Sequence, residues 1–188
     1  CWAIAGILLL FCCAGLVFLW WYFSSERDIK IYDFSVYWIS TLEIRQGMAD
    51  SIWRYLLLFR ETMSHEYTHL LAFPLSLAIQ LFGDSFTGYC QSIFVMYYLP
   101  ACFFLAVLAL RLARKAQGRR PGVFAFLAVF SLCALCPVFL WALLMGYTDV
   151  GGVLFLALIL NYSLDWDGVS FSWRRNLALA GLSVLLLL

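Results

Sequence analysis

Long apolar runs alternate with short polar segments along most of the chain, and their lengths predict membrane-spanning helices. The first run, residues 2–23, holds about twenty apolar residues, enough to cross a hydrocarbon core about 30 Å thick as one helix. Backbone groups in lipid must be hydrogen-bonded within the segment, which favours helices. We therefore predict an all-α, polytopic transmembrane protein with about five spans, the later ones at 92–110, 124–145, 150–162 and 177–188.

The stretch 25–83 between the first two long spans is the main polar interruption, and its pattern predicts short helices. Asp33 or Ser35 can cap a first helix, because a side-chain oxygen there accepts from a free backbone N–H. Gly47 is suited to end that helix, since glycine readily adopts the left-handed conformation that follows a helix C-terminus. We expect this stretch to form an external loop with juxtamembrane helices.

A second short helix is expected to follow, reaching to about residue 63. Asp50 or Ser51 can cap it, by the same side-chain chemistry. Ile52, Leu56 and Phe59 then recur at helical spacing and form one apolar stripe. A helix of this kind is expected to lie on the membrane surface, with its apolar face toward the lipid.

The apolar run 70–82 is too short to span a bilayer and contains Pro74, so we expect it to lie in the interface. The basic residues within 111–120 follow the next span and are expected to be cytoplasmic. The loop 25–83 then lies on the external or periplasmic side of a plasma or inner membrane. Asp84 is expected to cap the span that follows the loop.

Composition agrees with the apolar pattern. The chain is 65% hydrophobic and 12% charged, whereas soluble domains are nearer half and a quarter. No basic tract interleaved with aromatic residues indicates nucleic-acid binding. We read residues 1–188 as a single transmembrane domain. Because the chain starts at Cys1 and stops inside an apolar run, we expect it to be the N-terminal part of a longer protein.

Two aspartates are candidates for chemistry at the external face. Asp33 follows the first span closely, and a carboxylate there can accept a proton from an attacking hydroxyl or amine. Asp149 stands between two apolar runs, and Gly151 and Gly152 after it permit close approach of backbone or ligand. For each residue the alternative is a helix cap.

The segment His65-Glu66-Tyr67-Thr68-His69 has the spacing of a zinc-protease motif. On a helix, both histidines would share a face and could hold zinc, with the glutamate as general base. Pro74 follows closely and would disturb a helix continued through the motif. The segment 164–168 could supply a further ligand, but the predicted topology puts it in the cytoplasm. A membrane-bound zinc metalloprotease remains an alternative, and so do interfacial histidines that bind headgroups or water.

Two further possibilities concern arginines and transport. Arg54 and Arg60 could neutralise a substrate phosphate, although surface arginines also meet lipid headgroups. A transporter or a structural membrane protein without enzymatic activity is a third class. It would need polar residues in the middle of spans, which are scarce apart from Ser131 and Asn161.

Taken in order, these segments resemble the GT-C superfamily of integral-membrane glycosyltransferases, in the branch of protein O-mannosyltransferases and the bacterial aminoarabinose transferase. Asp33-Phe34-Ser35-Val36-Tyr37-Trp38 is similar to the motif that opens the family's first external loop. The segments 66–75 and 81–85 resemble the second juxtamembrane helix and the region after it. Asp149 is similar to an aspartate in the second external loop. The lysine-proline-proline segment of the aminoarabinose branch is replaced by Leu71-Ala72-Phe73-Pro74.

The resemblance implies an inverting glycosyltransferase that moves a sugar from a polyprenyl-phosphate donor to an acceptor, which is a lipid, a glycan or a protein. Asp33 would be the general base. Arginine, histidine or a divalent metal cation would stabilise the leaving phosphate. The implied substrate-binding residues are Glu66, Tyr67, His69, Asp149 and Arg60, with Asp149 and Glu66 also implied as metal ligands. The implied partners are the lipid-linked sugar, the acceptor and membrane lipids, and not nucleic acid.

Overall fold

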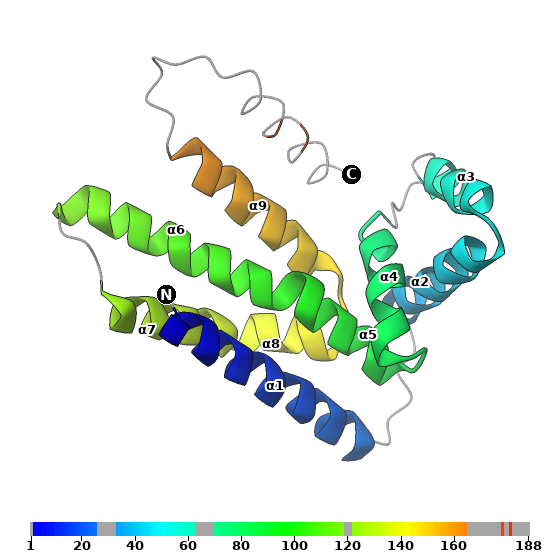
Figure 1. Cartoon of the computed structure of the whole chain (residues 1–188), viewed down its shortest axis with the longest axis horizontal. Coiled ribbons are helices and arrows are strands. Elements are labelled where there is room, and N and C mark those ends of the chain that lie inside the picture. Colours follow the sequence, from blue (N-terminus) through cyan, green and yellow to red (C-terminus); the bar gives the residue numbers. More distant parts are fainter. Residues whose placement is uncertain are drawn as a thin grey trace.

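The computed structural model describes residues 2–25, 33–62, 70–118 and 122–164, together with residues 178 and 181. Within these residues the chain is entirely helical, which confirms the predicted all-α class. The elements, shown in Figure 1, are α1 (Trp2–Ser25), α2 (Asp33–Asp50), α3 (Ile52–Thr62), α4 (Ala72–Phe82), α5 (Phe86–Ile93), the π-helix η1 (Phe94–Tyr98), α6 (Leu99–Gln117), α7 (Val123–Ala134), α8 (Pro137–Leu144) and α9 (Asp149–Ser163).

Two of the described helices are long and apolar enough to cross a membrane, Ala5–Ser25 and Phe86–Gln117. A third span is formed if α7 and α8 act together, since they are separated by a short break. The helix α9 is apolar but shorter. The structure therefore shows two or three candidate spans rather than the predicted five. Of the expected last span at 177–188, only Ala178 and Gly181 are among the described residues.

The central helix is the continuous segment α5–η1–α6, and it starts earlier than predicted. We expected the span to begin at Ser92, as the start of the long apolar run 92–110. The polar side chains of Gln91 and Ser92 are both hydrogen-bonded within the bundle. Ser92 Oγ donates to the Gly88 carbonyl at 2.8 Å, and Gln91 Nε2 donates to the Leu16 carbonyl on α1 at 3.2 Å. A polar residue whose hydrogen bonds are made internally does not have to leave the span.

A π turn interrupts this central helix just before Pro100. Proline has no N–H, and its ring clashes with the carbonyl four residues earlier. The backbone widens instead, and the Leu99 N–H bonds to the Phe94 carbonyl, five residues back. The helix thus continues past the proline without a break.

Pro137 stands inside the expected span 124–145, where a proline favours a kink, and the structure has one there. The axes of α7 and α8 differ by 52° across the break at Leu135 and Cys136. A helix end buried in an apolar bundle needs donors for its last carbonyls. The Tyr98 hydroxyl supplies one of them by donating to the Ala134 carbonyl.

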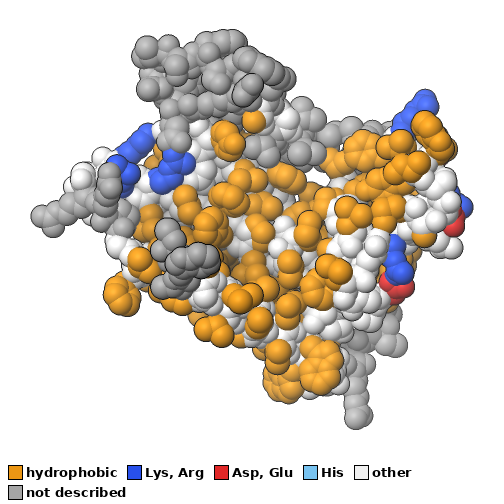
Figure 2. All heavy atoms as spheres, viewed as in Figure 1, with side chains coloured by type: hydrophobic (Ala, Val, Ile, Leu, Met, Phe, Trp, Pro, Cys, Tyr) orange, Lys and Arg blue, Asp and Glu red, His pale blue; other side chains and the backbone are white. Residues whose placement is uncertain are grey.

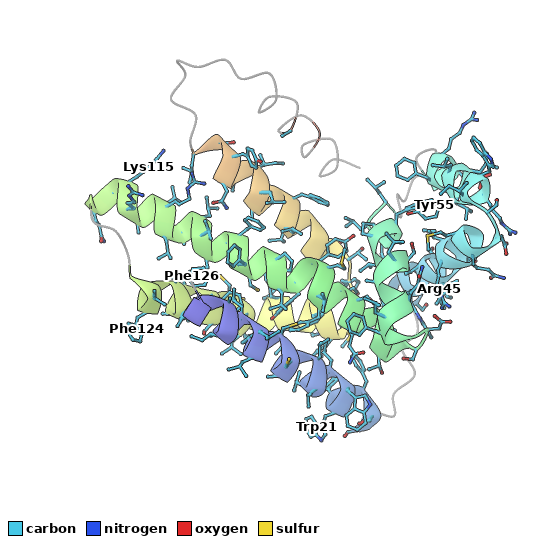
Figure 3. All side chains as sticks on the ribbon, viewed as in Figure 1. Trp21, Arg45, Tyr55, Lys115, Phe124 and Phe126 are labelled. Atoms are coloured by element: carbon cyan, nitrogen blue, oxygen red, sulfur yellow. The ribbon has the colours of Figure 1, made fainter. Side chains whose placement is uncertain are left out.

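The helices of the first loop gather at one end of the bundle. In Figure 1, α2, α3 and α4 lie at the end where α1 finishes and α5 begins. Figure 3 places Arg45 and Tyr55 at that end and Lys115 at the opposite one. Figure 2 shows hydrophobic side chains across the middle of the face in view, with Lys and Arg toward its two ends. The loop helices and the basic segment of α6 therefore lie at opposite ends of the described bundle.

Polar side chains tie α9 to the basic end of α6. The Arg111 Nη1 donates to the Asn161 carbonyl at 2.8 Å, and Lys115 donates to the Leu164 carbonyl. The Asn161 side chain, 6% exposed, donates to the carbonyls of Phe104 and Ala157, each at 2.8 Å. Cations at a helix C-terminus also favour its dipole. The hydrogen bonds of Arg111 and Asn161 therefore stabilise the contact between α6 and α9.

Helix α1 approaches the π turn closely at Gly15, which yields a stability prediction. A Cβ at Gly15 would lie 2.2 Å from Cζ of Phe94, whereas a Cβ at Gly6 would meet no described atom within 4 Å. Both Gly→Ala changes gain similar helix propensity. We expect Gly15→Ala to be less stable than Gly6→Ala by about 1–3 kcal/mol, the usual cost of overpacking. Unfolding in detergent micelles measures this, and equal stabilities would contradict the close packing.

Candidate functional site

Tyr37 and Trp38 of the Asp33–Trp38 motif pack the first half of α2 against the core that includes α5. The Trp38 Nε1 donates to the Asp84 carbonyl at 3.1 Å, and its ring lies 5.6 Å from that of Phe86. The described part of α2 starts at Asp33. The Asp33 side chain lies outside the part of the chain that the structure describes, so a cap at Asp33 stays a prediction.

The expected end of this helix at Gly47 is wrong, because α2 continues to Asp50. Gly47 lies inside α2 and faces α3. A Cβ there would come within 2.5 Å of Cδ1 of Leu58. Glycine is thus required by the close contact of two helices and not by a left-handed cap.

Helix α3 follows the predicted pattern more closely. Ser51 caps it by accepting from the Arg54 N–H at 3.1 Å, while the Arg54 Nη1 pairs with the Asp50 carboxylate at 2.6 Å. Arg54 is therefore engaged within the loop. Arg60, the other arginine proposed to bind phosphate, is exposed in the last turn of α3.

The apolar stripe of α3 stays on the surface. Ile52, Leu56 and Phe59 are 60%, 48% and 39% exposed, while Tyr55 and Leu58 on another face pack against a small core. That core consists of Ile44, Ala72 and Phe73, so it joins α2 to α4. The exposed stripe is what a helix on a lipid surface requires.

Asp149 is exposed and is the first residue of α9. Thr148 occupies the capping position, and its side chain makes no capping hydrogen bond. Asp149 is therefore not the N-cap, although a carboxylate in the first turn is favourable to the helix dipole. The turn before it contains Gly146, whose φ of +74° suits glycine and whose carbonyl accepts from the Tyr89 hydroxyl at 3.1 Å.

The start of α9 also touches the turn that precedes α4. A Cβ at Gly151 would lie 3.1 Å from Cδ2 of Leu71, and the Tyr97 hydroxyl donates to the Leu71 carbonyl at 2.6 Å. The structure thus brings the segment that directly follows His69 against the segment that directly follows Asp149. Gly151 was expected to permit a close approach, and the structure shows that Leu71 makes it, whereas Tyr97 was not among the expected residues.

The remaining predicted site residues, Glu66, Tyr67 and His69, lie outside the described residues, as does His65. Helix α4 begins at Ala72, so Pro74 stands in its first turn, where a missing N–H costs nothing. Leu164, the first residue of the segment 164–168 proposed to give a further zinc ligand, accepts a hydrogen bond from Lys115 at the end of α6 remote from Tyr97.

A metal site is not formed by the residues that the structure describes. Among them, no three His, Cys, Asp or Glu side chains are grouped closely enough to hold an ion. Of the two predicted metal ligands, Asp149 is exposed and Glu66 is outside the described ranges.

Sequence reasoning missed Tyr89 and Tyr97, which hold the two candidate segments in place. Both are buried, at 0% and 2% exposure. A signal existed, since a tyrosine inside a span has to find a hydrogen-bond partner for its hydroxyl. The sequence contains no indication of which carbonyl accepts it.

Comparison of the chain with protein-family models, with curated proteins and with solved structures finds no match.

The expectation that Asp84 caps α5 is wrong and leads to a test. Ser85 Oγ accepts from the Gly88 N–H at 3.1 Å, and Asp84 pairs instead with Arg45 of α2. Asp84 is 56% exposed, and exposed ion pairs contribute little. We expect Ser85→Ala to lower the free energy of unfolding by about 1 kcal/mol and Asp84→Asn by less. Denaturation in micelles compares the two, and the reverse order would restore Asp84 as the cap.

Proposed function

We propose that this chain is part of an inverting glycosyltransferase. It would move a sugar from a polyprenyl-phosphate donor to an acceptor at the external face of a plasma or inner membrane. The full arrangement would have about five spans in this region. The proposal rests on the resemblance of the ordered segments, beginning with Asp33–Trp38, to the GT-C superfamily. Asp33 is the general base.

One observation supports this function over the alternatives. The start of α2, the turn 70–71 and the start of α9 are at the same end of the bundle, away from the basic end of α6 (Figure 1). A lipid-linked donor keeps its tail in the bilayer and its phosphate at the surface. A site at one end of the spans meets such a phosphate and a water-soluble acceptor together.

The chemistry follows from charge and direction. The acceptor hydroxyl or amine attacks the anomeric carbon from the side opposite the lipid phosphate, and Asp33 takes its proton. The bond from the anomeric carbon to the phosphate oxygen breaks with inversion, and the lipid phosphate leaves. Arg60 and His69 are the chain's own candidates to stabilise its negative charge. Glu66, Tyr67 and Asp149 would orient the sugar.

The described residues give less support to a zinc protease and to a transporter. For a zinc protease, Leu164 is bonded to Lys115 near the end of α6 remote from the turn 70–71, so the described residues do not bring the segment 164–168 and the turn 70–71 together. For a transporter, the buried Asn161 would have to line a path, but its amide is engaged by the carbonyls of Phe104 and Ala157.

Asp33→Asn in the parent protein, assayed in membranes, tests the proposal. We expect transfer of labelled sugar from a polyprenyl-phosphate donor to fall by at least about a hundredfold, because an amide cannot accept the proton. Glu43→Gln is the matched control, since Glu43 is an exposed carboxylate on the same helix. It should retain transfer.

Bound zinc, measured in the same samples with Glu66→Gln alongside, separates the protease. Wild-type protein that transfers no sugar, and that loses one zinc on changing His65 or His69, would refute the glycosyltransferase.

A further inference from the structure

Two buried tyrosines on the central helix donate to carbonyls on both sides of the candidate site. Tyr89 on α5 holds the Gly146 carbonyl at 3.1 Å, three residues before Asp149. Tyr97 on η1 holds the Leu71 carbonyl at 2.6 Å, two residues after His69. Both hydroxyls are withdrawn from solvent, so neither is placed to act on a substrate directly.

The π turn brings the side chains of Tyr89 and Tyr97 closer to one face of the central helix. An α-helix turns by about 100° per residue, so side chains eight residues apart differ by about 80°. A π turn closes a wider ring and turns less per residue. Because η1 includes Phe94 to Tyr98, the side chains of Tyr89 and Tyr97 are separated by a smaller angle about the helix axis than in a regular α-helix.

The contact that Tyr97 maintains is tight. Gly151 is buried, and a Cβ there would be 3.1 and 3.2 Å from the two Cδ atoms of Leu71 and 3.4 Å from the Tyr97 ring. The side chain of Leu71 thus rests directly on the first turn of α9, while its carbonyl is fixed by the tyrosine. The lack of a side chain at Gly151 and one hydrogen bond together set the separation of the two backbones.

We propose that Tyr97 is a positioning residue, which holds the turn after His69 at a set distance from the helix that starts at Asp149. The proposal rests on the glycosyltransferase function for its catalytic consequence, and on the Tyr97–Leu71–Gly151 contacts for its geometry. Tyr97 acts through the backbone of Leu71 and does not contact the reacting atoms. Without its hydroxyl, the turn 70–71 loses this hydrogen bond to the central helix.

Cross-linking tests the geometry without any assay of activity. Leu71→Cys and Gly151→Cys are introduced together into the parent protein with its native cysteines replaced, and a short thiol cross-linker is applied in membranes. We expect Tyr97→Phe to lower the rate of cross-linking by about fivefold, the factor that one hydrogen bond is worth. Tyr98→Phe is the matched control, because its hydroxyl bonds to Ala134 instead. Equal rates in both variants would overturn the proposal.

Kinetics on the protein with its native cysteines test the catalytic consequence. We expect Tyr97→Phe to lower kcat by about tenfold or more, because small misplacements of catalytic groups are costly, with little change in the KM for the lipid-linked donor. Tyr98→Phe should leave kcat near that of the wild type. An unchanged kcat in Tyr97→Phe would also overturn the proposal. Wild-type protein that transfers no sugar would refute the function, and the cross-linking would still decide whether Tyr97 sets the distance.

Discussion

The described bundle depends on hydroxyl groups that satisfy carbonyls inside an apolar interior. Three tyrosines on one continuous helix each donate to a backbone carbonyl where another segment ends or turns: Tyr89 to Gly146, Tyr97 to Leu71 and Tyr98 to Ala134. A carbonyl left open in such surroundings has no water to bind. The bend at Pro137 and the turns before α4 and α9 are tolerated because the central helix supplies these donors. Tyrosine suits this role, since its ring packs as an apolar group while its hydroxyl reaches a neighbour.

Run length, proline positions and capping chemistry could be predicted from the sequence because they act within a few residues. The all-α class, the bend before Pro137 and the cap at Ser51 are of this kind. The errors arose where a distant partner decided the outcome. Gly47 is compatible with a helix end, yet its place is dictated by Leu58 on the next helix. Asp84 is a good capping residue, yet it forms an ion pair with Arg45, and Ser85 caps α5 instead.

The candidate site shows the same division. Asp33 and Asp149 were singled out because each begins or borders an apolar segment, and α9 does start at Asp149, while the described part of α2 starts at Asp33. The link between the turn 70–71 and α9 could not be inferred from spacing. It joins Leu71, Tyr97 and Gly151, whose separation along the chain carries no periodic signal. Such a link depends on the packing of three helices and on a π turn, which becomes visible only when the fold is known.

The hydrogen bonds of Tyr89 and Tyr97 limit how the central helix can move within the bundle. Tyr89 and Tyr97 lie well apart on the central helix, and their hydroxyls bond to different segments. If the central helix moved along its axis or rotated about it, both hydrogen bonds would be strained. We therefore expect the central helix to move less than the segments that are hydrogen-bonded to it. A movement that admits a bulky ligand at this end would then involve the turn 70–71 and the turn before α9.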